Sequence, residues 1–98
     1  MLIVTGKVRV RPEEIGAALT LSLEHVHRSR LEPGCILHTV HQDVEDPDSV
    51  VFIEHWADRD ALTAHFRVPA SGEFVTAMTR LSTEPPSIEI YDVERVKL

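Results

Sequence analysis

Residues 50–66 read VVFIEHWADRDALTAHF, and their pattern changes midway from that of a β-strand to that of a helix. The first seven residues are mostly β-branched or aromatic, which is typical of a strand covered on both faces. Side chains of a strand alternate between faces, so Phe52, Glu54 and Trp56 share one face. We therefore expect a carboxylate and an indole to lie side by side on this strand.

The second half of this stretch predicts a helix that begins after Asp58, whose side-chain oxygen can cap it. Leu62, His65 and Phe66 follow at spacings of three and four residues, which places them on one helix face. If the helix folds back onto its own sheet, its apolar face packs against the sheet, and His65 faces the sheet with it. We therefore expect His65 to reach one pocket together with the carboxylate and the indole of the strand.

The rest of the chain supplies three further strands and two further helices. Alternating residues and breaking pairs of Pro and Gly mark their limits. The expected segments are a strand at 2–10, a helix from Pro12 to Pro33-Gly34, a strand at 35–42, a hairpin loop at 43–49, residues 50–66, a helix from Ser71 to Pro85-Pro86, and a strand at 87–98. The order β-α-β-β-α-α-β predicts an α+β, ferredoxin-like fold with a four-stranded antiparallel sheet, in one domain that spans residues 1–98.

One face of this sheet has no cover within the chain. The third strand carries Val51 and Ile53 on the face away from Glu54, and the helices can cover only one side. Apolar surface of this kind is rarely left exposed on a monomer. We expect a homodimer whose interface includes Val51, Ile53 and Val96.

Composition limits the partners and the compartment. The net charge is −6, from 10 basic and 16 acidic residues, which argues against nucleic acid as a partner. The single cysteine cannot form an internal disulfide, and the N-terminus does not resemble a signal peptide. No apolar run approaches the ~20 residues of a membrane span. A cytoplasmic protein without a membrane partner is expected.

Pairing across the hairpin places His38 beside Glu54. The preferred register keeps apolar partners together. Its pairs are His41 with Val51, Val40 with Phe52, His38 with Glu54, and Ile36 with Trp56. Two interpretations of the His38–Glu54 pair stay open, because the pair can share a mobile proton or can simply satisfy two polar groups inside a sheet.

The remaining candidates also have a structural and a functional interpretation. Trp56 can donate its indole N–H into a pocket or serve as a core aromatic. His65 can be a base or a core histidine, and the apolar side chains can be core residues or the wall of a cavity. These apolar candidates are Phe52, Phe66, Phe74 and Met78.

No metal or cofactor is expected from the motifs. Six histidines are present, but His25 and His27 diverge on a helix, and His38 and His41 point to opposite faces of a strand. Phosphate-binding glycine motifs are absent as well.

Several short motifs, in order, resemble the antibiotic biosynthesis monooxygenase (ABM) domain family. They are Ser29-Arg30-x-Glu32-Pro33-Gly34-Cys35, Glu54-x-Trp56, Ala61-Leu62-x-Ala64-His65 and Ser71-x-x-Phe74. The resemblance implies a dimeric α+β barrel and a cofactor-independent monooxygenase that oxidises a phenolic, quinol or polyketide-like molecule with O2. In that chemistry His38 or His65 would be the base, Glu54 would orient it, and Trp56 would stabilise developing negative charge.

Other activities of the superfamily fit less well or stay open. Haem-degrading relatives use an Asn on the first strand and a His in the third helical segment, whereas this sequence contains no Asn and has Gly6 near that strand position. A non-catalytic dimer that binds a small molecule or stabilises a partner is the alternative, because a fold does not determine a function. Isomerase-like proton transfer on a lactone or enol is a third possibility.

Overall fold

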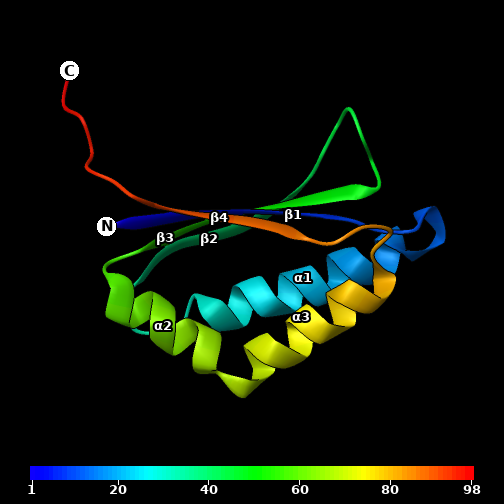
Figure 1. The fold of residues 1–98 in the computed structure, drawn as a ribbon, viewed down its shortest axis with the longest axis horizontal. Helices are drawn as coiled ribbons and strands as arrows, with labels where there is room; N and C mark the ends of the chain where they lie inside the picture. Colours follow the sequence, from blue (N-terminus) through cyan, green and yellow to red (C-terminus); the bar gives the residue numbers. More distant parts are fainter.

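The computed structural model describes residues 1–98, and its element order is the predicted one (Figure 1). The elements are β1 (Leu2–Arg9), a 3-10 helix (Pro12–Glu14), α1 (Ile15–Ser29), β2 (Cys35–Gln42), β3 (Ser49–Trp56), α2 (Arg59–Arg67), α3 (Pro69–Leu81) and β4 (Ser87–Asp92). The strands form one antiparallel sheet in the order β2-β3-β1-β4. The fold is therefore α+β and ferredoxin-like, with the second helical segment split in two.

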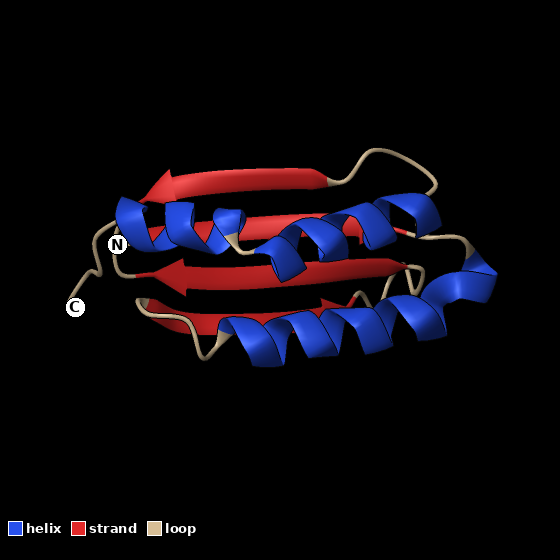
Figure 2. Ribbon diagram, turned by 90° about the horizontal axis from the view of Figure 1, so that it is seen from below, coloured by secondary structure: helices blue, strands red, loops and turns tan.

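All three α-helices lie on one face of the sheet, as Figure 2 shows in a view through the helices. On β3, Val50, Phe52, Glu54 and Trp56 face the helices and are buried, while the residues between them are only half-buried on the other face. The apolar core forms two clusters, one around Phe52 and one around Trp56. Glu54 lies between these two residues on β3, so the polar site occupies the gap between two apolar clusters.

The register between β2 and β3 follows the prediction for three pairs and departs from it at the fourth. His41 pairs with Val51, Val40 with Phe52, and His38 with Glu54. The predicted pairing of Ile36 with Trp56 is wrong, because Cys35 lies opposite Trp56 and the register shifts between Cys35 and Leu37. The extra residue of this bulge leaves Ile36 58% exposed.

Some helices and strands begin or end at residues other than the predicted ones. Helix α1 follows a 3-10 turn at Pro12, and α3 begins at Pro69 rather than Ser71, because a first-turn proline loses no hydrogen bond. The last strand ends at Asp92 instead of residue 98. Its partner β1 starts at Leu2, directly opposite Asp92, so later residues have no strand to pair with.

The turn that joins α1 to β2 requires a glycine. Gly34 has a φ of +82°, and a Cβ at this position would lie 2.5 Å from the Cβ of Ala61 on α2. Its carbonyl also accepts a 2.8 Å hydrogen bond from the backbone N–H of Ala57. The close approach of Gly34 lets α2 lie directly against this turn.

The sheet face away from the helices is open in the single chain. Val51 and Ile53 are half-buried on it, and the β2–β3 loop and the segment after β4 project on this side (Figure 1). Strand β4 is exposed along its whole length. None of the helices is both long enough and apolar enough to cross a membrane.

Candidate functional site

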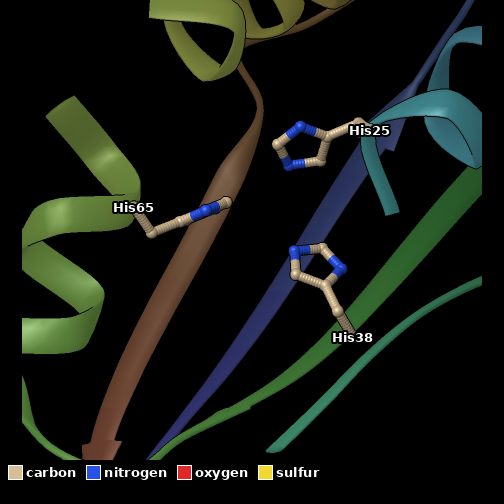
Figure 3. Close-up of side chains that lie close together, drawn as sticks. All are labelled: His25, His38 and His65. Carbon is tan, nitrogen blue, oxygen red and sulfur yellow. The ribbon is translucent and has the colours of Figure 1, made fainter. Parts of the chain in front are cut away.

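Four ionisable side chains from four elements meet beneath the helices. They are His25 of α1, His38 of β2, Glu54 of β3 and His65 of α2, and all are buried, with exposed fractions of 7% or less. Figure 3 shows the three imidazole rings turned toward one another. Their ring centroids lie 5.2 to 5.6 Å apart. We refer to these four residues as the His/Glu cluster.

Glu54 is the centre of the cluster. Its Oε1 accepts a 2.9 Å hydrogen bond from Trp56 Nε1, and it lies 3.3 Å from His38 Nε2 and 3.8 Å from His65 Nε2. Burial acts to raise the pKa of Glu54, but His38, the Trp56 hydrogen bond and His65 together outweigh it and lower the pKa below its usual range. Glu54 is therefore a carboxylate at neutral pH.

His65 is held in one orientation by a second carboxylate. Its Nδ1 lies 2.9 Å from Oε1 of Glu32, which immediately precedes the Pro33-Gly34 turn. A carboxylate only accepts hydrogen bonds, so Nδ1 carries a proton and donates it to Glu32, while Nε2 points toward Glu54. The ring also packs against Trp56, with centroids 4.6 Å apart.

His25 and His38 have contrasting surroundings. His25 stacks on Phe74 with ring centroids 4.0 Å apart, and its Nδ1 accepts a 3.0 Å hydrogen bond from Arg28 Nη2. Burial, together with His38, His65 and Arg28, lowers the pKa of His25 to about 3, so this ring is neutral at pH 7. His38 is fully buried, yet neither of its ring nitrogens makes an aligned hydrogen bond, because the contact with Glu54 is close but poorly directed.

A cavity of about 370 Å³ opens beside the cluster, between the sheet and α3. Its apolar wall contains all four apolar residues that were predicted from the sequence, Phe52, Phe66, Phe74 and Met78. Of the cluster, Glu54, His65 and His25 line the cavity.

Two of the predicted site residues, Trp56 and His38, do not line the cavity. The expectation that Trp56 faces the cavity is wrong: its indole is fully buried and donates to Glu54, because that carboxylate on the same strand face is its nearest acceptor. His38 is adjacent to Glu54, as predicted, and is shielded from the cavity by it. The structure thus brings together Glu54, Trp56, His65 and His38, but only Glu54 and His65 can touch a bound molecule.

Sequence reasoning missed His25 and Glu32. A signal for His25 was present, since it falls on the same helix stripe as Ser22, Val26 and Ser29, all of which are buried. The small serines of this stripe indicate the face that packs closely against the sheet. Glu32 carried no comparable signal, because its role depends on how the turn approaches α2.

Comparisons with known proteins agree with this architecture. The family model described as antibiotic biosynthesis monooxygenase matches residues 1–77. Uncharacterized protein sll1783 of Synechocystis is 35% identical over 92 residues, which are 94% of this chain and 63% of that protein. The chain thus spans a little under two thirds of the length of this curated relative.

Solved structures show the same fold. The crystal structure of an antibiotic biosynthesis monooxygenase is 30% identical, with a TM-score of 0.89 over 97% of this chain and 100% of the other. A conserved protein from Methanosarcina mazei Go1 is 26% identical, with a TM-score of 0.90 over 95% and 92% of the two chains. The order of elements, the matched residues and these likenesses lead to one conclusion: the chain belongs to the antibiotic biosynthesis monooxygenase family.

Proposed function

We propose that the protein is a monooxygenase that oxidises a small phenol, quinol or polyketide-like molecule with O2. The observation that carries the proposal is the pairing of His65 with Glu54 on the wall of a cavity that three phenylalanines also line. The cavity volume, about 370 Å³, lies in the range of small-molecule sites. Phe52, Phe66 and Phe74 offer flat apolar contacts for a ring system.

The proposed reaction needs no electron donor besides the substrate. A quinol and O2 give a hydroxyquinone and water, and the quinol supplies all four electrons that O2 accepts. The protein has to remove a phenolic proton, which makes the ring electron-rich enough to reduce O2. It also has to keep the ring in a dry site.

His65 is the best placed of the two predicted bases. Its ring lines the cavity, whereas His38 does not, and Glu32 holds the ring by Nδ1. In many enzymes a carboxylate or other hydrogen-bond acceptor orients the catalytic base in this way. Glu54 would stabilise the imidazolium that forms, while His38 and Trp56 would act only through Glu54, as positioning residues.

The test is O2 uptake with a panel of phenols and quinols, without added flavin and in the presence of EDTA. We expect substrate-dependent uptake above the enzyme-free rate and a loss of about 10²- to 10⁴-fold in His65→Gln. His27→Gln is the matched control, because His27 is exposed on α1 and does not line the cavity. Uptake no faster than the enzyme-free rate across the panel would overturn the proposal. Saturable binding of a panel member without uptake would instead favour a small-molecule-binding protein.

We also propose that two copies pack through their open sheet faces, as the resemblance implied. The half-buried Val51 and Ile53 on that face support this arrangement. Val96, also expected at the interface, is 76% exposed in the segment after β4. Light scattering should give about twice the chain mass of 11.0 kDa at micromolar concentration. A stable particle of the single-chain mass would contradict it.

A further inference from the structure

The three histidines of the His/Glu cluster converge on one point beneath the helices. One ring nitrogen from each of His25, His38 and His65 lies within 4.8 Å of the others. The rings come from a helix, a strand and a second helix, and Figure 3 shows them facing a common point. No pair of them has the sequence spacing of a known metal motif, so only the fold brings them together.

The chain's own hydrogen bonds leave one ring of the cluster poorly paired. His38 is 1% exposed, its Nδ1 has no partner, and its Nε2 has only the poorly directed contact with Oε1 of Glu54 at 3.3 Å. A buried polar group without a well-directed partner costs about 1–3 kcal/mol. A cation bound at Nε2 would replace this contact with a directed bond.

We propose that His25, His38 and His65 bind one divalent first-row transition metal ion, with Zn²⁺ as the reference ion. Neutral imidazoles are the ligands such ions prefer, and three histidines with an open fourth position form one of the common zinc arrangements. Oε1 of Glu54 lies 3.3 Å from His38 Nε2 and 3.8 Å from His65 Nε2. It is therefore placed to accept a hydrogen bond from a water on the ion.

The distances need only a small contraction. Nitrogens bound to Zn²⁺ at about 2.0–2.1 Å lie roughly 3.4 Å apart in a tetrahedron. Starting from separations of up to 4.8 Å, each ring would move inward by about 0.8 Å. Side-chain rotation can supply a movement of this size without shifting the backbone.

The surroundings also suit a cation. Glu32 on Nδ1 of His65 completes a carboxylate–histidine pair of the kind that orients metal-bound imidazoles. Glu54 and Glu32 offset the added positive charge. For His25 to bind through Nε2, its Nδ1 must carry the proton. Arg28 must then release Nδ1 and keep its second partner, the carbonyl of Ala70 at 3.3 Å.

This inference goes beyond the proposed oxidation and is tested separately from it. A metal on His65 would occupy the nitrogen that the proposed base uses, so added Zn²⁺ should slow quinol oxidation relative to the rate measured in EDTA. Metal binding can be present without turnover, and turnover can be present without metal binding. Failure of one proposal therefore leaves the other measurable.

The direct test is a Zn²⁺ titration of the full chain without an affinity tag, after removal of metals with EDTA and desalting. Calorimetry should give one ion per chain with a dissociation constant below ~1 µM. His38→Leu and His25→Leu should weaken binding by at least about 100-fold, since even outer-shell changes cost 10- to 100-fold. His27→Ala is the matched control, because His27 is exposed on α1 outside the cluster, and it should bind as the wild type does.

A second measurement uses the unaltered protein, so it does not depend on whether the variants fold. Of the six histidines, Zn²⁺ should shift the ring ¹⁵N resonances of the three in the cluster and leave the other three in place. The proposal is overturned if the dissociation constant exceeds ~1 µM, if binding persists in both cluster variants, or if the resonances of His27, His41 and His55 move instead.

Discussion

Gly34→Ala is expected to be one of the most damaging single methyl additions in this chain, for two separable reasons. A φ of +82° in a residue with a Cβ costs roughly 1–2 kcal/mol. The new Cβ would also lie 2.5 Å from the Cβ of Ala61, well inside ordinary contact, so α2 would have to move by about 1 Å. Overpacking of this kind costs about 1–3 kcal/mol, so the free energy of unfolding should fall by about 2–5 kcal/mol in total.

Ala61→Gly separates the two contributions, because it removes the atom that the new methyl group strikes and leaves the φ of residue 34 unchanged. In a double-mutant cycle measured by urea unfolding, Gly34→Ala should cost only about 1–2 kcal/mol in the Ala61→Gly background. All four proteins should be compared at one concentration, since association would add to the apparent stability. Equal costs in both backgrounds, with a coupling below about 0.5 kcal/mol, would refute the steric argument.

Three further predictions concern single side chains. The folded pKa of His25 is about 3 and its unfolded value is near 6.5, so the folded state binds fewer protons between these values. The free energy of unfolding should therefore rise with pH from 5 to 7 by at most about 1 kcal/mol per unit, and by less where solvent reaches the ring from the cavity. His25→Leu in EDTA should flatten this slope. Trp56→Phe removes the donor to Glu54 and should lower the free energy of unfolding by about 1–3 kcal/mol, whereas an unchanged urea midpoint would show that this hydrogen bond contributes nothing. Asp58→Ala should cost about 1 kcal/mol through loss of the cap on the N–H of Ala61, and Asp58→Asn should retain most of the stability.

Element order was predictable because alternation and breaking residues are local properties of the chain. The same parity placed Glu54 on the helix side of the sheet and His38 beside it, since a strand face is set by every second residue. The bulge at Cys35–Leu37 and the end of β4 were not predictable in this way. Both depend on where a partner strand begins or ends, and the local sequence of one strand does not predict the limits of another.

The site was predictable to the extent that it lies on one continuous segment. Residues 54–65 run from strand to helix with only a short turn, so His65 had to return toward Glu54. His25 arrives from a separate helix, and its contact depends on the rotation of α1 over the sheet. The direction of the Trp56 indole was not predicted for a different reason. The alternation of residues along a strand gives only the sheet face of a side chain, whereas the rotamer of Trp56 depends on its hydrogen bond to Glu54.

The sheet order β2-β3-β1-β4 has a consequence for how the chain folds. Strand β1 is made first but occupies the interior of the sheet, and its final partner is the last strand, with Met1 and Val93 joined by hydrogen bonds in both directions. Such distant pairing slows folding relative to a chain of local contacts. All four members of the His/Glu cluster lie on α1, β2, β3 and α2, which precede β4 in the chain. Ser87 and Ile88 of β4 line the cavity, so the last strand completes the wall of a site whose ionisable groups all come from earlier elements.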